Sequence, residues 1–286
     1  MMTSDRDWTG RVGDIWATEW RRTDRSFEGL APVLNAAILA AAGPQSRTVV
    51  DIGCGAGATS LASAQALPDG QVIGIDLSPT LIAVANHRAG HLTNVVFRCA
   101  DVAASVETLA PIDLYVSRHG VMFFADPVAA FAQLAEAAAP GAGLVFSCFA
   151  ERAANRWAVE TVAGADDASG PTGAMTTPGP FAFADPAYVV EMLKQAGWSA
   201  TTPQRVEFAY RAGGGADPVA DAVDYLSRIG PAASRIRETH GAERGQALAR
   251  LTSACVDRLA GDAVEFPAAA WIWTAHRPRD SQGSLP

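Results

Sequence analysis

Residues 49–57 read VVDIGCGAG, a short apolar strand that ends in an acidic residue and leads into three alternate glycines. Glycine adopts backbone angles that other residues avoid, and it lets a ligand approach the main chain closely. A helical pattern begins near Ala58, directly after the last glycine. In open α/β sheets, ligands bind beyond the carboxyl ends of the strands. The stretch therefore predicts a strand–turn–helix unit with a ligand site at the turn.

The same order of a short apolar run, a turn and an amphipathic helix continues to residue 149. Runs that are apolar on both faces are typical of parallel strands covered by helices. We expect strands at 48–51, 71–75, 95–98, 112–116 and 143–149. Ser78-Pro79 and Asp126-Pro127 are typical helix starts, because each pairs a capping side chain with proline at the first helical position. The alternation predicts an α/β fold with a Rossmann-like, doubly wound and mostly parallel sheet.

The flanking segments predict one domain over residues 1–286. We expect helical N-terminal cover at 1–45, a ligand-binding core at 46–150, substrate-side insertions and the last strands at 151–276, and a flexible tail at 277–286. The third part is expected to hold a long loop at 164–180, a helix at 185–196, a strand at 206–210, a helical insertion at 217–262 and a last, antiparallel strand at 269–276. These runs bring the expected sheet to seven strands.

Composition excludes several classes of partner. The chain of 286 residues has a net charge of −8 and a single lysine, Lys194, whereas nucleic-acid binding needs many cations to neutralise phosphates. The four cysteines are far apart, so we expect no metal site and no disulfide framework, and a reducing cytoplasm. No signal peptide and no membrane-spanning run is evident. We expect a small-molecule substrate, no nucleic acid, no membrane, and a monomer or homodimer.

Acidic residues follow three successive strands of the predicted sheet. Asp51 ends the first, Asp76 ends the second and Asp101 follows the third. Asp51 is poorly placed beside a pyrophosphate but well placed to hold an ammonium group. Asp101 is suited to accept a hydrogen bond from the exocyclic amine of an adenine. The alternatives are that Asp51 caps the next helix and that the other two are turn residues.

A nicotinamide dinucleotide site is the rival interpretation of the same turn. Gly53, Gly55 and Ala58 satisfy the loose G-x-G-x-x-G/A pattern, and Asp76 lies at a suitable distance for a ribose hydroxyl. The pattern alone does not decide between the two. A ring of three carboxylates favours a sulfonium cofactor without phosphates.

These residues resemble the class I S-adenosylmethionine-dependent methyltransferases, in particular the small-molecule branch similar to the ubiquinone/menaquinone-biosynthesis enzymes. Residues 51–57 resemble the first motif of that family, and residues 117–127, SRHGVMFFADP, resemble its fourth-strand motif. The resemblance implies S-adenosyl-L-methionine as the cofactor. It also implies that the cofactor-binding residues are Asp51, Gly53, Cys54, Gly55, Asp76, Leu77, Asp101, Val102 and Ser117. The family branch has an aromatic residue where this chain has His119, and the chain lacks an Asn/Asp-Pro-Pro-Tyr motif.

Methyl transfer from a sulfonium is an in-line displacement, and a base is needed only where the nucleophile must lose a proton. His119 follows the fourth strand, and we expect it either to deprotonate or to orient the substrate; the alternative is a histidine packed behind the cofactor. The candidate substrate-binding residues are Trp16, Trp20, Arg118, Met122, Arg152 and Trp157. The alternative for the two N-terminal tryptophans is core packing, and an arginine in the position of Arg118 is more often structural.

The leading function is methylation of a small molecule, at oxygen or carbon. An NAD(P)-dependent oxidoreductase is disfavoured by Asp51 and by the lack of an obvious Tyr-x-x-x-Lys pair. A non-catalytic adenosyl-binding protein stays open as a third interpretation.

Overall fold

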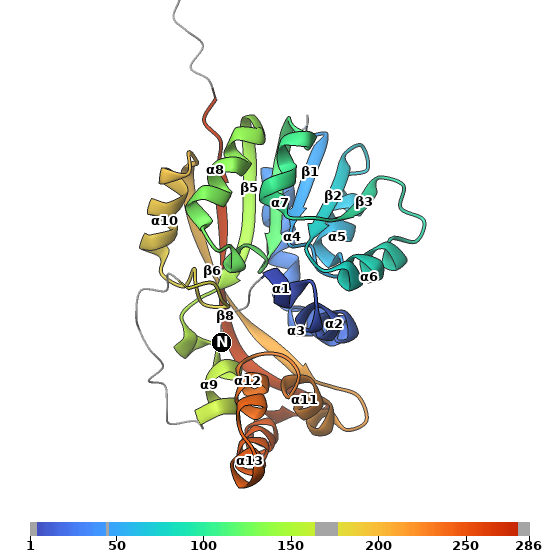
Figure 1. Cartoon of the computed structure of the whole chain (residues 1–286), viewed down its shortest axis with the longest axis vertical. Coiled ribbons are helices and arrows are strands. Elements are labelled where there is room, and N and C mark those ends of the chain that lie inside the picture. The colour runs from blue at the N-terminus through green and yellow to red at the C-terminus, as the bar shows by residue number, and fades with distance from the viewer. Residues whose placement is uncertain (1–4, 44–45, 164–176, 280–286) are drawn as a thin grey trace, which may run out of the picture.

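A computed structural model describes residues 5–43, 46–163 and 177–279 of the chain (Figure 1). Most of the loop predicted at 164–180 and of the tail predicted at 277–286 therefore lies outside the described residues. No helix in the described part is both long and apolar enough to cross a bilayer.

One mixed sheet forms the centre of the molecule, with the strand order β3-β2-β1-β4-β5-β8-β6. Its parallel part consists of β1 (Thr48–Ile52), β2 (Gln71–Asp76), β3 (Val95–Cys99), β4 (Ile112–Arg118) and β5 (Ala138–Phe149). Strand β8 (Ala263–His276) runs antiparallel between β5 and β6 (Ser199–Gly213). The predicted Rossmann-like class and the antiparallel last strand are confirmed.

The described sheet has eight strands rather than the predicted seven. The additional strand is the two-residue β7 (Leu259–Ala260), which pairs with the start of β8 through a tight turn at Gly261. Gly261 has a φ of 63°, a value that glycine adopts without the steric cost of a Cβ. A strand this short has no hydrophobic alternation to read, which is why sequence analysis missed it.

Strands β6 and β8 are both much longer than predicted. The first half of β6 is largely exposed because β6 is an edge strand, so it lacks the apolar pattern of a buried strand. Pro203 is tolerated there because an edge strand need not donate on its outer side. In β8, Pro267 precedes the segment paired with β5, which covers residues 270–276, so it too breaks no inner ladder.

Helices cover both faces of the parallel strands. One layer contains α4 (Ala31–Ala41), α5 (Ala58–Ala66) and α6 (Pro79–Ala89); the other contains α7 (Val102–Ser105), the 3₁₀ turn η1 (Val106–Leu109), α8 (Pro127–Ala137) and α10 (Pro186–Gln195). The predicted helix starts are confirmed: Ser78 accepts a hydrogen bond from the Leu81 amide, and Asp126 from the Ala129 amide.

A helical lobe forms beyond the parallel strands, in the lower part of Figure 1. It consists of α9 (Arg156–Ala163), α11 (Pro218–Leu226), α12 (Pro231–Glu238) and α13 (Gly241–Asp257), which pack on one another and on β6 and β8. The insertion predicted at 217–262 is thus helical up to residue 257, and it covers the extensions of these two long strands.

The N-terminal helices α1 (Asp5–Trp8), α2 (Arg11–Thr18) and α3 (Trp20–Ser26) lie below the carboxyl ends of the parallel strands in Figure 1. Helix α2 packs on α6, and α3 packs on β6. The predicted site at the strand ends is therefore covered on one side by helices of residues 5–26.

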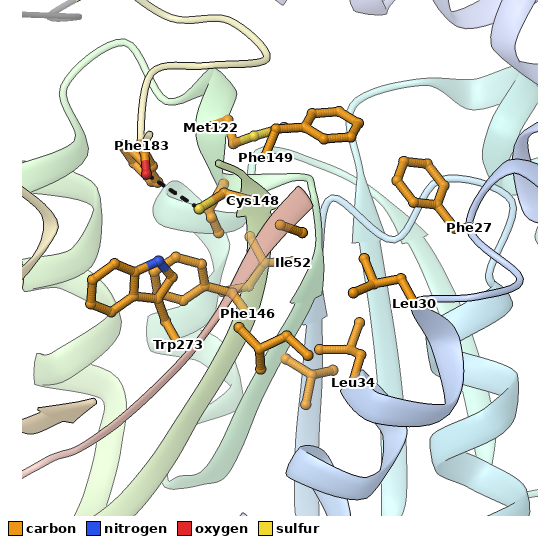
Figure 2. Close-up of a cluster of buried hydrophobic side chains, with 14 of the residues drawn as sticks. Phe27, Leu30, Leu34, Ile52, Met122, Phe146, Cys148, Phe149, Phe183 and Trp273 are labelled. Carbon is orange, nitrogen blue, oxygen red and sulfur yellow. Dashed lines mark hydrogen bonds between the residues drawn. The ribbon is translucent and has the colours of Figure 1, made fainter. Parts of the chain in front are cut away.

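The core runs from the parallel strands toward this covered edge. Figure 2 shows Phe146 on β5 beside Trp273 on β8, with Leu30 and Leu34 of the N-terminal segment on the other side of the strands. Phe146 and Trp273 are stacked with 6.3 Å between ring centroids, and both are fully buried. Apolar packing thus fixes the strands whose ends carry the candidate site.

Candidate active site

The glycine turn, residues 53–57, lies between β1 and α5, and its glycines have different roles. Gly55 has a φ of 54°, and a Cβ added to it would meet no atom within 4 Å. Gly57 has a φ of 84°, and a Cβ there would lie 2.8 Å from the ring of Phe97. Gly57 is therefore required by packing, whereas Gly55 faces open space. The turn leaves its backbone accessible at Gly55, as a ligand cradle requires.

Asp51 lies at the end of β1 and is fully buried. Its Oδ2 accepts a hydrogen bond from Ser60 Oγ at 2.5 Å, in the first turn of α5, while its Oδ1 has no partner. Burial raises the pKa of Asp51 to about 7. A buried carboxylate oxygen without a partner costs free energy unless a ligand satisfies it. Asp51 thus helps to hold α5 and also presents a free acceptor to the cavity.

Asp76 connects the end of β2 to the glycine turn. Its Oδ2 accepts from the Gly55 amide at 2.8 Å and its Oδ1 from the Ser78 amide at 2.9 Å. Burial raises the pKa of this carboxyl group. Asp101 follows β3 and accepts from the Ala103 amide at 2.9 Å, so it also caps α7.

One cavity of about 380 Å³ joins these residues to the N-terminal helices. Of the predicted cofactor-binding residues, it is lined by Asp51, Gly53, Cys54, Gly55, Asp76, Leu77, Asp101 and Val102. We call the part around Asp51, Asp76, Asp101 and the glycine turn the acidic end. Parallel strands bring their carboxyl ends to one edge, which explains why residues 50 positions apart meet there.

Ser117 is the exception among the predicted cofactor-binding residues, because it is absent from the cavity lining. Its hydroxyl group donates to the Ile52 carbonyl at 2.7 Å and accepts from the Gly120 amide at 3.2 Å. The side chain therefore holds the end of β1 against the turn after β4.

His119 follows β4 with a φ of 61°, a left-handed conformation that is unusual for a residue with a side chain. Its ring packs between Phe27 and Phe149, with centroid distances of 4.7 and 4.3 Å. Nδ1 lies 2.9 Å from Ser147 Oγ, and Nε2 has no partner. Burial, with the nearby Arg118 cation, lowers the pKa of His119 to about 3. The ring is therefore uncharged at neutral pH. Strained conformations of this kind cluster at functional sites.

Arg118 lines the cavity, but its charge is already paired. Its Nη2 lies 2.7 Å from Asp24 Oδ1 of α3, and Arg88 of α6 lies 2.6 Å from Asp24 Oδ2. Arg88 also donates to the Ala56 carbonyl in the glycine turn at 2.7 Å and stacks on Trp20. Asp24 therefore ties the N-terminal helices to the glycine turn, and Arg118 is part of that connection.

The opposite part of the cavity is built from aromatic rings, and we call Phe27, Phe149, Trp157 and Tyr210, together with His119, the aromatic end. Figure 2 shows Phe149, the last residue of β5, and Phe27 on the side of the carboxyl ends of the strands, and their ring centroids are 5.8 Å apart. Trp157 stacks on Tyr210 with centroids 4.9 Å apart. These rings come from four separate segments of the chain.

The predicted substrate-binding residues are divided by the structure. Trp16, Trp20, Arg118, Met122 and Trp157 line the cavity. Arg152 does not, because it donates to the Ala158 carbonyl and packs over Phe181. Sequence analysis missed Phe27, Phe149 and Tyr210. Phe149 could have been found as the last residue of a predicted strand. No motif in the sequence around Phe27 or Tyr210 indicates that they line the cavity.

Comparison with known proteins identifies the core of the chain. Residues 49–141 match the family described as the methyltransferase domain. The chain is 36% identical over 98 residues to a trans-aconitate 2-methyltransferase from Acidovorax sp. (strain JS42), which is 34% of this chain and 36% of that relative. The chain thus spans little more than a third of the length of this curated relative.

Solved structures extend the likeness to most of the chain, at the level of the fold. The YcgJ protein from Bacillus subtilis superposes with a TM-score of 0.55 at 16% identity, over 86% of this chain and 98% of that one. A phosphoethanolamine N-methyltransferase 2 from Haemonchus contortus, in complex with S-adenosyl-L-methionine, gives a TM-score of 0.55 at 17% identity, over 97% of this chain and 60% of that one.

Proposed function

Residues 49–141 match the methyltransferase domain family, and from that premise we propose that this chain is a class I S-adenosylmethionine-dependent methyltransferase that transfers a methyl group to a small molecule. The transfer takes place at oxygen or carbon by in-line displacement. The observation that carries the proposal is the unpartnered Oδ1 of Asp51, buried at the end of β1 beside the glycine turn. An ammonium group is the natural partner for such an oxygen.

The donor set of the acidic end suits an adenosyl amino acid. Asp51 would hold the ammonium group of the methionine moiety, Asp76 the ribose hydroxyls and Asp101 the exocyclic amine of adenine. The open space at Gly55 admits the ligand to the backbone of the turn. When bound, this cofactor supplies an electrophilic methyl group on a positively charged sulfur. A pyrophosphate would instead face the carboxylate of Asp51, which disfavours a nicotinamide dinucleotide.

The chain contributes alignment and exclusion of water. The N-terminal helices, tied down through Asp24, cover the strand ends, and aromatic rings line the cavity opposite the acidic end. Holding reactants in line can supply about 7–11 kcal/mol of rate acceleration. His119 is uncharged and buried, so we propose that it orients the acceptor.

Calorimetric titration tests the proposal. S-adenosylhomocysteine and NADH are titrated separately into the purified protein, its Asp51→Asn variant and a control, Asp262→Asn, whose side chain is 88% exposed. We expect S-adenosylhomocysteine to bind and NADH not to bind. Loss of the charge-assisted bond should raise the dissociation constant of Asp51→Asn roughly 10- to 100-fold, with no change in the control. Binding of NADH without S-adenosylhomocysteine would refute the proposal.

The remaining expectations about partners and compartment are part of this proposal. The net charge of −8 disfavours nucleic acid as the methyl acceptor. The four cysteines are free, which suits a reducing cytoplasm. We propose a monomer or homodimer, to be distinguished by light scattering of the purified protein.

A further inference from the structure

Two buried polar atoms of the cavity lining have no hydrogen-bond partner among the described residues. Six buried side-chain nitrogen or oxygen atoms lack a hydrogen bond in the described part of the chain, and two of these belong to lining residues. They are Asp51 Oδ1, at the acidic end, and His119 Nε2, at the aromatic end. Each unpaired atom is a position where a ligand group is expected. The proposed cofactor accounts for the first and leaves the second unexplained.

The hydrogen bond to Ser147 sets the chemistry of His119 Nε2. Ser147 is fully buried, and its hydroxyl has His119 Nδ1 as its partner in the described part of the chain. If the hydroxyl donates to Nδ1, the proton of the neutral ring lies on Nε2 and a single donor is unsatisfied. If Nδ1 donates instead, both the Ser147 proton and the Nε2 lone pair are unsatisfied. The first arrangement leaves fewer buried polar groups unpaired, so Nε2 is a hydrogen-bond donor.

The rings around His119 offer little other polarity. Trp157 Nε1 donates to Asn155 Oδ1 at 3.3 Å, and the Tyr210 hydroxyl lies 3.2 Å from that of Tyr225. Their polar atoms are therefore already paired, and their apolar ring surfaces remain for a ligand. Flat rings of this kind favour contact with another ring.

The charges of the lining disfavour an anionic acceptor. In the described lining, Arg118 is the one cationic side chain, and it is paired with Asp24. The lining also carries the carboxyl groups of Asp24, Asp51, Asp76, Asp101 and Asp126. A substrate with several carboxylates would have to give up hydration without finding a free cation, which opposes its binding.

We infer that the methyl acceptor is an uncharged, largely apolar ring compound with an oxygen that accepts a hydrogen bond from His119 Nε2. The inference rests on the proposed function and names the substrate class of the same site. This acceptor differs from the substrate in the name of the Acidovorax relative. That substrate, trans-aconitate, carries three carboxylates. His119 positions the acceptor oxygen and removes no proton from it; as the bond from the methyl carbon to this oxygen forms and its bond to sulfur breaks, the sulfonium leaves as a neutral thioether and the proton of a hydroxyl acceptor passes to water.

Binding to the protein loaded with S-adenosylhomocysteine tests this inference without requiring turnover. The probes are 2-naphthol and 2-naphthoate, which share a ring system and differ in charge at neutral pH, and trans-aconitate. We expect 2-naphthol to bind at least ten times more tightly than either anion. If it does not, and this includes the case in which none of the three binds, the inference is overturned. A failure of S-adenosylhomocysteine itself to bind would instead overturn the proposed function.

Variants test the role of His119. His119→Phe keeps a ring but removes the donor, and His119→Asn tolerates the left-handed backbone better; His87→Phe, at an exposed position outside the lining, is the matched control. We expect His119→Phe to weaken 2-naphthol about tenfold, His119→Asn to weaken it less, and the control to leave it unchanged. Retained binding of S-adenosylhomocysteine shows that each variant is folded. Equal affinity for 2-naphthol in all these proteins would refute the hydrogen bond to Nε2.

Discussion

Cofactor affinity should depend on pH through Asp51. The pKa of this carboxyl group is raised to about 7, mainly by burial; the nearby carboxylate of Asp76 acts in the same direction, and Ser60 and Arg118 oppose the shift. Pairing with an ammonium group requires the ionised form, so binding below the raised pKa must release a proton. At about pH 6, roughly ten in eleven free molecules carry a neutral Asp51, which weakens binding about tenfold relative to about pH 8. His119, with a pKa of about 3, does not titrate in this range.

The assay is calorimetric titration of S-adenosylhomocysteine in buffers of different ionisation enthalpy. We expect the dissociation constant to rise as the pH falls through about 7 and about one proton to be released per site in the acidic limit. Asp51→Asn should bind weakly with a flat profile, and Asp262→Asn should follow the original protein. A constant affinity from about pH 6 to about pH 8, or the same profile in Asp51→Asn, would refute the reasoning.

The raised pKa of Asp51 affects the stability of the unliganded protein in the opposite direction: stability falls as the pH rises, whereas cofactor affinity increases. A raised pKa in the folded state means that the stability contributed by Asp51 is complete below the ordinary aspartate pKa of 3.8 and is lost as the pH rises through about 7. The cofactor should therefore raise the melting temperature more at about pH 8 than at about pH 6, because it compensates the buried charge.

Three further predictions follow from the packing. Gly57→Ala should cost about 1–3 kcal/mol of unfolding free energy, because its Cβ would meet Phe97, and Gly55→Ala less, which urea denaturation would show; an equal cost would contradict the assignment. Asp24→Asn should loosen α3 and raise the dissociation constant for S-adenosylhomocysteine. Its stability cost should be about 1 kcal/mol, because the ion pairs of Asp24 are partly exposed. Unchanged affinity would count against the connection that Asp24 makes between the N-terminal helices and the glycine turn. Phe146→Ala should cost about 3–5 kcal/mol, since the ring is fully buried, and a change below about 1 kcal/mol in urea denaturation would contradict that packing.

Local patterns were sufficient for the first half of the fold. Four of the five parallel strands were predicted to within two residues, since buried strands are continuous apolar runs bounded by turn residues. Strand β5 begins five residues before its predicted start, in a partly exposed stretch with Pro140 and Gly141. The long antiparallel strands β6 and β8 were predicted only in part. The parts of these strands that were not predicted are exposed, or contain proline, or pair with one neighbour. Their stability therefore comes from partners far away in the chain.

The acidic end of the cavity was determined by the sequence alone. Three carboxylates at the ends of neighbouring parallel strands must meet, because the strands share a direction and an edge. The aromatic end was decided by the tertiary structure. Phe27, Phe149, Trp157 and Tyr210 meet only because the N-terminal helices and two extended strands converge there. Likewise, Arg118 pairs with Asp24, 94 positions away, and His119 pairs with Ser147, 28 positions away. Contacts between segments so distant leave no local periodicity, so no pattern in the sequence predicts them.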